Sequence, residues 1–214
     1  MLDIGANYGL YSITAASHVP NCHAYAFECN PSILGTLRSN VALNSPAIDA
    51  SGSNITVVGQ AVSDRCGCSQ FLERIDDGHG SLQIHAAGTP PSPRGVMDVP
   101  TIDGEWMSQN LDFEIIDFCK IDVEGAEQTV IKGLKPLLRE KRIKRIQIEV
   151  TSKTSAVLDK LLNYGYTLAV TGPPHRLAPA EVGRFPPKSW SMICLKAPVV
   201  LDIKRRSGRE LRGD

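Results

Sequence analysis

The 214-residue sequence has no apolar run near the roughly 20 residues that a membrane-spanning helix needs, so we expect no membrane segment. It has no excess of one charge either, because its 23 basic and 23 acidic residues cancel. Without a net positive field, nucleic acid and anionic membranes are not favoured as partners. The first residues also lack a basic leader followed by an apolar stretch. We therefore expect a cytoplasmic location, unless a targeting segment precedes this sequence.

The six cysteines lack the spacing of a redox or zinc motif. Cys66 and Cys68 are separated by one glycine, which is too short for C-x-x-C, and no second ligand pair follows at zinc spacing. The other four are scattered, at Cys22, Cys29, Cys119 and Cys194. This distribution predicts buried, reduced thiols of the kind found in cytosolic proteins, and no metal ligands.

Strand-like and helix-like runs alternate along most of the chain, which predicts parallel β-α-β units in one domain over residues 1–200. The expected strands are 2–4, 22–28, 54–61, 114–121, 143–150, 166–171 and 189–196. The expected helices are 9–18, one that begins at Asn30 and runs to about 43, a short one through Trp106, about 126–139 and about 154–163. Because the last two strands have no helix between them, we expect an antiparallel pair there. The predicted fold is α/β and Rossmann-like: a mostly parallel seven-stranded sheet with a reversed last strand and helices on both faces.

Three segments depart from this alternation. Residues 64–98 are rich in Gly, Pro, Ser and Asp, which predicts a lid-like insertion. Residues 172–188 are proline-rich and are expected to form a surface loop, and residues 201–214 form a basic tail that is expected to be solvated. The lid and the proline-rich loop are the segments expected to define the substrate, but neither contains a readable specificity motif.

The opening stretch, residues 3–12 (DIGANYGLYS), reads as a strand end, a glycine turn and a helix start. Gly5 and Gly9 allow the backbone to turn tightly and to approach a ligand, and the N–H groups of the following helix then face the crevice. A dinucleotide site would need G-x-G-x-x-G, and the middle glycine is missing here. The stretch therefore favours a nucleotide-like ligand without a pyrophosphate, with Asp3 as an acceptor for its amino group.

A second acidic residue, Glu28, ends the second predicted strand 25 residues after Asp3. In an open α/β sheet this position faces a ribose, and a carboxylate can accept hydrogen bonds from both of its hydroxyls. Asn30 is expected to fix the turn behind Glu28. Ala61 and Val62, after the third strand, lie where an adenine edge would be bound.

Charged residues crowd the end of the fourth predicted strand, in residues 117–127 (DFCKIDVEGAE). Lys120 and Asp122 are two positions apart and share one face of the strand, and Glu124 follows at the turn into a helix. Open α/β sheets bind ligands at this edge, so the three residues predict one wall of an active site. Asp122, Glu124, Glu149 and His79 are the candidate bases, and Glu149 can also join Asp122 around Mg²⁺.

Four stretches together resemble the FkbM-type family of S-adenosylmethionine-dependent methyltransferases, a class I methyltransferase family. They are residues 3–12, 26–31 (AFECNP), 101–103 (TID) and 117–127, in order from residue 1 to about Glu149. The sequence departs from the family at Cys29, where proline is more usual. It also starts at the first motif, so we expect a catalytic core without the segment that would cover the cofactor.

The resemblance implies S-adenosylmethionine as the cofactor and assigns its site. The expected cofactor-binding residues are Asp3, Gly5, Asn7, Gly9, Tyr11, Ser12, Glu28, Asn30, Ala61, Val62 and Asp122. The expected catalytic residues are Lys120, Asp122 and Glu124. An Asn/Asp-Pro-Pro-Tyr motif, typical of amino-group methyltransferases, is missing after the fourth strand. We therefore expect methylation of a hydroxyl on a small molecule or carbohydrate; the alternatives are an NAD-dependent oxidoreductase and a non-catalytic domain with the same fold.

Overall fold

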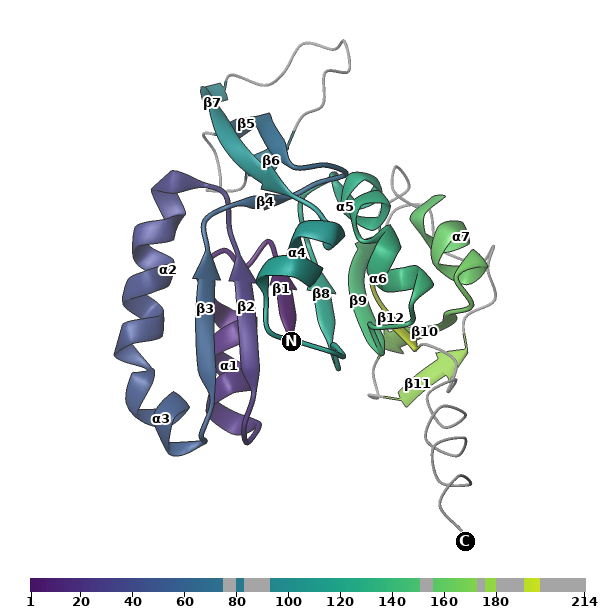
Figure 1. Ribbon diagram of the computed structural model, residues 1–214, viewed down its shortest axis with the longest axis horizontal. Coiled ribbons are helices and arrows are strands. Elements are labelled where there is room, and N and C mark those ends of the chain that lie inside the picture. The colour runs from purple at the N-terminus through teal and green to yellow at the C-terminus, as the bar shows by residue number, and fades with distance from the viewer. Residues whose placement is uncertain (75–79, 83–92, 151–155, 173–175, 180–190, 197–214) are drawn as a thin grey trace, which may run out of the picture.

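The computed structural model describes residues 1–74, 80–82, 93–150, 156–172, 176–179 and 191–196. Its main sheet is built from β1 (Leu2–Ile4), β2 (His23–Phe27), β3 (Asn54–Val58), β8 (Cys119–Ile121), β9 (Arg145–Val150), β10 (Thr167–Gly172), β11 (Arg176–Pro179) and β12 (Ser191–Lys196). The strands lie in the order β11-β10-β12-β9-β8-β1-β2-β3 (Figure 1). Pairing from β9 to β3 is parallel throughout.

The reversed last strand is confirmed, because β12 pairs antiparallel with both of its neighbours, β9 and β10. The sheet has one strand more than predicted. β11 forms within the segment that was expected to be only a loop, and pairs antiparallel with β10 at the sheet edge. Its four residues include a proline, and a short edge strand of this kind gives little signal in the sequence.

Helices cover both faces of the sheet. They are α1 (Leu10–His18), α2 (Pro31–Leu43), α3 (Ser45–Ala50), α4 (Gly104–Asn110), α5 (Glu127–Gly133), α6 (Lys135–Arg139) and α7 (Ala156–Asn163). In Figure 1, α1 lies behind the sheet and α4 in front of it. The single helix predicted over 126–139 is in fact α5 and α6, which meet at Leu134. Pro136 lies in the first turn of α6, and it has no N–H for a continuous helix.

The central strands are buried on both faces, as expected for a parallel sheet covered by helices. Leu2 and Ile4 of β1 pack with Cys119 and Ile121 of β8 in the largest hydrophobic cluster. The strand predicted at 114–121 is shorter than expected and comprises only β8, with a single bridge from Ile116 to Ile143 before it. None of the helices in the described residues is both long and apolar enough to cross a bilayer.

The described residues of the segment predicted as a lid-like insertion, 64–98, contribute to a second, four-stranded sheet that begins before this segment and ends after it. It consists of β4 (Ala61–Val62), β5 (Gly67–Arg74), β6 (Gly80–Leu82) and β7 (Pro93–Ile102), in the order β4-β7-β5-β6. In Figure 1 it stands above the ends of β2 and β3. The long antiparallel pairing of β5 with β7 joins residues far apart in sequence, so local composition did not reveal it. The third strand also ends earlier than predicted, and Ala61 belongs to this second sheet.

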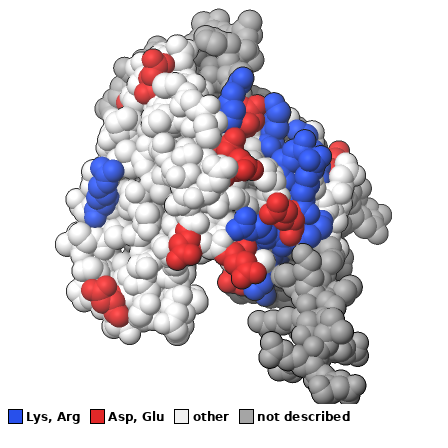
Figure 2. All heavy atoms as spheres, in the orientation of Figure 1, with Lys and Arg blue, Asp and Glu red and all other residues white. Residues whose placement is uncertain are grey.

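The face drawn in Figure 2 carries basic side chains over α5 and α6, with acidic side chains between them. Two surface lysines form close ion pairs. Lys132 lies 2.5 Å from Asp64, and Lys144 lies 2.5 Å from Asp117. Charges of both signs therefore share this face.

Candidate active site

A cavity of about 120 Å³ lies where β1, β2 and β8 end. The first residue after each strand, namely Gly5, Glu28 and Asp122, lines this cavity. Open parallel sheets place their ligand sites at this edge, because loops diverge there and helix N-termini point inward. The site residues predicted from the sequence that line it are Gly5, Asn7, Glu28, Asn30, Ala61, Val62, Lys120, Asp122 and Glu124.

Four predicted cofactor-binding residues, Asp3, Gly9, Tyr11 and Ser12, are not among the described residues that line this cavity. Asp3 is fully buried, and its Oδ2 accepts hydrogen bonds from the Ser12 N–H (3.1 Å) and the Ser12 hydroxyl (2.6 Å). Gly9 has φ of 90° at the start of α1, a conformation that favours glycine. Asp3, Gly9 and Ser12 therefore build the turn and fasten it to β1.

Glu28 is held rigidly by backbone groups. Its Oε2 accepts from the Asn7 N–H at 2.9 Å, and its Oε1 accepts from the Asn30 N–H at 2.8 Å. The side chain is only 8% exposed, and burial raises its pKa above the ordinary value. Each carboxylate oxygen can accept a further hydrogen bond, so the group can still bind two hydroxyls. Asn30 in turn caps α2 by accepting from the Ser32 N–H at 3.0 Å, as predicted for the turn behind Glu28.

Lys120 is 4% exposed and lies among three oxygen atoms. Its Nζ donates to the Gly5 carbonyl at 2.5 Å and lies 3.6 Å from Asp3 Oδ1 and 3.5 Å from Asp122 Oδ2. The ammonium group also lies 5.4 Å from the centre of the Tyr11 ring. Lys120 therefore links β1, β8 and the glycine turn.

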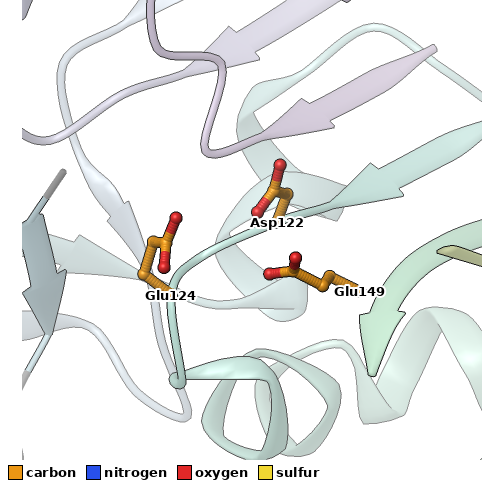
Figure 3. A group of neighbouring side chains, drawn as sticks. All are labelled: Asp122, Glu124 and Glu149. Atoms are coloured by element: carbon orange, nitrogen blue, oxygen red, sulfur yellow. The ribbon is translucent and has the colours of Figure 1, made fainter. Parts of the chain in front are cut away.

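Asp122 and Glu124, which line the cavity, meet a third carboxylate, Glu149. Oxygen atoms of Asp122, Glu124 and Glu149 all lie within 4.8 Å of one another, and Figure 3 shows the three groups turned toward a shared space. Glu124 has φ of 51°, so the chain turns sharply after β8 and returns this side chain toward Asp122. Glu149 comes from β9, the neighbouring strand.

The crowding of negative charge around Glu149 raises the pKa of its carboxyl group. Burial first, and then the negative charges of Asp122, Glu124 and Glu127, raise the pKa of Glu149 to about 7. Glu127, at the start of α5, is 2% exposed, and burial raises its pKa as well. The repulsion between carboxylates at this separation is relieved either by a shared proton or by a bound cation. The oxygen ligands of Asp122, Glu124 and Glu149 suit Mg²⁺.

Some apolar residues that line the cavity with Glu28 were missed by the sequence analysis. Phe71 comes from β5 of the second sheet, and Cys29 and Ile33 follow Glu28. The aromatic residue in the run Gln70-Phe71-Leu72 was a usable signal for a strand within the expected lid. Burial raises the pKa of Cys29 to about 12, so this thiol serves as apolar surface and not as a nucleophile.

The expectation of uniformly buried thiols was wrong. Of the five cysteines whose side chains the structure describes, Cys119 is buried, Cys22 and Cys29 are half-buried, and Cys66 and Cys68 are exposed. The exposed pair lies at the start of β5, a strand that was not predicted. His79, a candidate base, and the tail at 201–214 lie outside the described residues.

Comparisons with known proteins identify the family and the fold. A model of the methyltransferase FkbM domain matches residues 3–168. The solved FkbM methyltransferase of Methylobacillus flagellatus KT is 17% identical with a TM-score of 0.55, and the match covers 92% of this chain and 42% of that one. The AMB antimetabolite synthetase AmbE of Pseudomonas aeruginosa is 25% identical over 79% of this chain.

This chain spans only part of each relative, since it corresponds to 10% of the synthetase. The solved structure supports the fold, which is the Rossmann-like fold of methyltransferases. The domain match covers the glycine turn, Glu28 and the carboxylate cluster within one continuous range. The chain therefore belongs to the FkbM family of methyltransferases.

Proposed function

We propose that this chain binds S-adenosylmethionine and transfers its methyl group to a hydroxyl on a neutral small molecule or sugar. The observation that carries the proposal is Glu28, a buried carboxylate fixed by two backbone N–H groups at the cavity wall. A carboxylate in this position can accept from both ribose hydroxyls of the cofactor. The Gly5 turn lines the same cavity, and it lacks the glycine pattern of the phosphate-binding loop that a dinucleotide would require.

The rest of the cofactor has matching surfaces. Ala61, Val62 and Phe71 supply an apolar wall next to Glu28, which suits an adenine ring. The glycine turn and Asp122, which line the same cavity, supply polar groups for the amino-acid end. The sulfonium next to that end would then present its methyl group to the wall that contains Asp122 and Glu124.

Methyl transfer to oxygen breaks the bond between sulfur and the methyl carbon as the bond from oxygen to that carbon forms. The leaving group is a neutral thioether, so much of the catalysis comes from alignment, but the hydroxyl proton must be removed. Asp122 is the candidate base at the cavity wall, and Glu149 can share the proton with it, because the two side chains are hydrogen-bonded. Glu124 adds negative charge to the same pair.

The charge of this wall also favours one class of acceptor. Asp122, Glu124 and Glu149 form an acidic surface, and the ammonium of Lys120 is already engaged beneath it. A carboxylate or phosphate close to the reacting hydroxyl would be repelled. Neutral polyols and sugars, which donate several hydrogen bonds, fit better.

The same three carboxylates support a second proposal on cofactors, a divalent cation such as Mg²⁺. If bound, the cation would lower the pKa of the acceptor hydroxyl. Assays of methyl transfer in the presence of a chelator decide between a bound cation and a proton shared by Asp122 and Glu149. Loss of transfer that Mg²⁺ restores supports the cation, whereas an unchanged rate leaves the shared proton as the working arrangement.

The proposed function is tested first by calorimetric titration with S-adenosylmethionine and with NAD. We expect S-adenosylmethionine to bind, and Glu28→Ala to weaken binding by roughly 100-fold, because two hydrogen bonds to a charged group are lost. Glu105→Ala, which removes an exposed carboxylate on α4, is the matched control and should leave the affinity unchanged. Binding of NAD without S-adenosylmethionine would overturn the proposal.

The acceptor is tested by incubating the chain and methyl-labelled S-adenosylmethionine with a metabolite extract. We expect label in an ether-linked methyl group of a neutral product. Label on nitrogen would overturn the preference for oxygen. Cofactor binding without transfer to any component of the extract would favour a non-catalytic domain.

A further inference from the structure

The side chain of Lys120 is almost entirely enclosed, although it lines the cavity wall. It is 4% exposed, and its nearest oxygen atoms belong to Gly5, Asp3 and Asp122. An ammonium has three N–H groups, and these three neighbours lie in hydrogen-bond or ion-pair range of it. Little of its donor capacity is left for an acceptor molecule.

Asp3 depends on Lys120 for charge balance. Its Oδ2 accepts two hydrogen bonds from Ser12, whereas its Oδ1 has no hydrogen-bond partner among the described residues and lies 3.6 Å from Lys120 Nζ. A fully buried carboxylate is costly unless a cation compensates it. Part of the role of Lys120 is therefore to compensate the buried negative charge of Asp3 beneath the turn.

The other contacts of Lys120 join the two halves of the cavity. The backbone of Gly5 lies directly against that of Asp122, since a Cβ on Gly5 would lie 1.9 Å from the Asp122 carbonyl oxygen. The Asp122 N–H donates to the Ile4 carbonyl at 3.1 Å. Lys120 adds a bridge at the same junction, from the Gly5 carbonyl to the Asp122 carboxylate.

We propose that Lys120 is a positioning residue, which fixes the Gly5 turn and the Asp122 carboxylate relative to each other and does not contact the acceptor. This assignment replaces the catalytic role that the sequence suggested for Lys120. It rests on the proposed function only for its kinetic test. Its structural test uses the protein without any ligand.

Three variants separate positioning from charge balance. Lys120→Met keeps the length of the side chain and removes the ammonium. Lys120→Met combined with Asp3→Asn also removes the buried charge that would otherwise be uncompensated. Lys144→Met is the control, because Lys144 is 45% exposed and pairs with Asp117 on the surface.

Five quantities are measured for each variant. The first two are the thermal midpoint and the hydrogen exchange of the peptide that covers residues 5–9. The other three are the affinity for S-adenosylmethionine, kcat, and KM for the acceptor. The first two measurements need neither cofactor nor acceptor.

We expect Lys120→Met to lower the thermal midpoint and the double variant to recover most of it. In both Lys120 variants, hydrogen exchange at residues 5–9 should be faster than in the parent. The affinity for S-adenosylmethionine should be roughly tenfold lower, and kcat should be lower by about tenfold or more, because one charge-assisted hydrogen bond is lost. KM for the acceptor should stay within about twofold, because no acceptor contact is removed. Lys144→Met should match the parent in every measurement.

Two results would overturn the proposal. Parental exchange and cofactor affinity in the double variant would mean that Lys120 only balances Asp3. A raised KM for the acceptor with unchanged exchange would mean that Lys120 contacts the acceptor. If the parent itself binds no S-adenosylmethionine, the proposed function fails, and the exchange of residues 5–9 still decides the role of Lys120.

Discussion

Glu28 lines the cavity together with Asp122 and Glu124, which meet Glu149 in a carboxylate cluster, and the two sets of carboxylates lie in opposite environments. Each oxygen of Glu28 receives a backbone N–H, at 2.9 and 2.8 Å. The cluster carboxylates instead face one another, and their mutual repulsion adds to burial in raising the pKa of Glu149 to about 7. The first environment makes a fixed acceptor, and the second makes a group that changes charge near neutral pH.

The difference originates in the backbone. Glu28 directly follows β2, and the turns on both sides of it direct their N–H groups at its carboxylate. After β8, positive φ angles at Glu124 and Gly125 reverse the chain and bring a second acid toward Asp122. The fold therefore supplies donors around Glu28, on the side that we propose for the cofactor, and like charges around Asp122, on the side that we propose for the acceptor.

The largest expected effect comes from Gly5→Ala, which acts where the two sides touch. The new Cβ would lie 1.9 Å from the Asp122 carbonyl oxygen, at a φ of 75°. Overpacking and backbone strain together should lower the free energy of unfolding by about 3 kcal/mol or more. Chemical denaturation measures the loss, and calorimetry should find no remaining affinity for S-adenosylmethionine.

Gly35→Ala is the matched control for this substitution. Gly35 lies in α2, and a Cβ there meets nothing within 4 Å. Because alanine is the better helix former, this variant should gain about 0.5–1 kcal/mol. Similar stability in the two variants would contradict the close contact between the turn and the acceptor wall.

A smaller effect is expected from Glu28→Gln, which removes the charge on the cofactor side and keeps the volume. An amide has one acceptor oxygen, so the N–H of either Asn7 or Asn30 loses its partner. The free energy of unfolding should fall by about 1–3 kcal/mol, the cost of an unsatisfied buried donor. Urea denaturation of this variant and its parent tests the value, and unchanged stability would mean that the two hydrogen bonds contribute nothing.

Glu124→Gln makes the same change on the acceptor side, and it should act in the opposite direction. One of three neighbouring negative charges disappears, so repulsion within the cluster falls. We expect the thermal midpoint to rise by roughly 1–3 °C while methyl transfer weakens, a common exchange of stability for activity at an active site. A lower midpoint would show that Glu124 makes stabilising contacts that outweigh the repulsion.

The cofactor side was largely predictable from the sequence because its signals are local. Gly5, Glu28 and Asn30 each lie at a strand end or a helix start that can be recognised from a few neighbouring residues. Phe71 was missed because its position depends on the pairing of β5 with β7, and that register is set by contacts between distant segments. Asp3 was expected at the end of the first strand, but it is the middle residue of β1. Its burial beneath the turn depends on contacts with Ser12 and Lys120, which only the folded chain brings together.

The acceptor side was predicted in composition but not in arrangement. The sequence placed Lys120, Asp122 and Glu124 on one wall, and the structure brings them to the same cavity. The enclosure of Lys120 could not be read from the chain, because it results from packing against the glycine turn of another strand. Glu149 was named as a candidate, but its raised pKa arises from charges on other segments.

The smallest expected effect is a dependence of stability on pH that arises from Glu149. Its pKa is raised from 4.5 to about 7 in the folded chain, so between these values the folded state holds a proton that the unfolded state has released. Stability must then fall as pH rises across this window, and the contribution is constant below it. Burial raises the pKa of Glu28 and Glu127 too, which adds slope of the same sign. To isolate the contribution of Glu149, the thermal midpoint is measured from pH 4.5 to 7 for the parent and for Glu149→Gln. The difference between the two pH dependences is the contribution of Glu149.

The same variant distinguishes the two arrangements proposed for the acceptor side. With a shared proton, the transfer rate of the parent should rise through about pH 7 as the pair loses it, and Glu149→Gln should abolish that rise. With a bound divalent cation, the carboxylates stay ionised to lower pH, so adding Mg²⁺ should flatten the stability slope of the parent and leave Glu149→Gln nearly unaffected. A parent and variant with identical slopes, with and without Mg²⁺, would mean that Glu149 is solvated like an ordinary surface acid, and that the contrast with Glu28 is one of position alone.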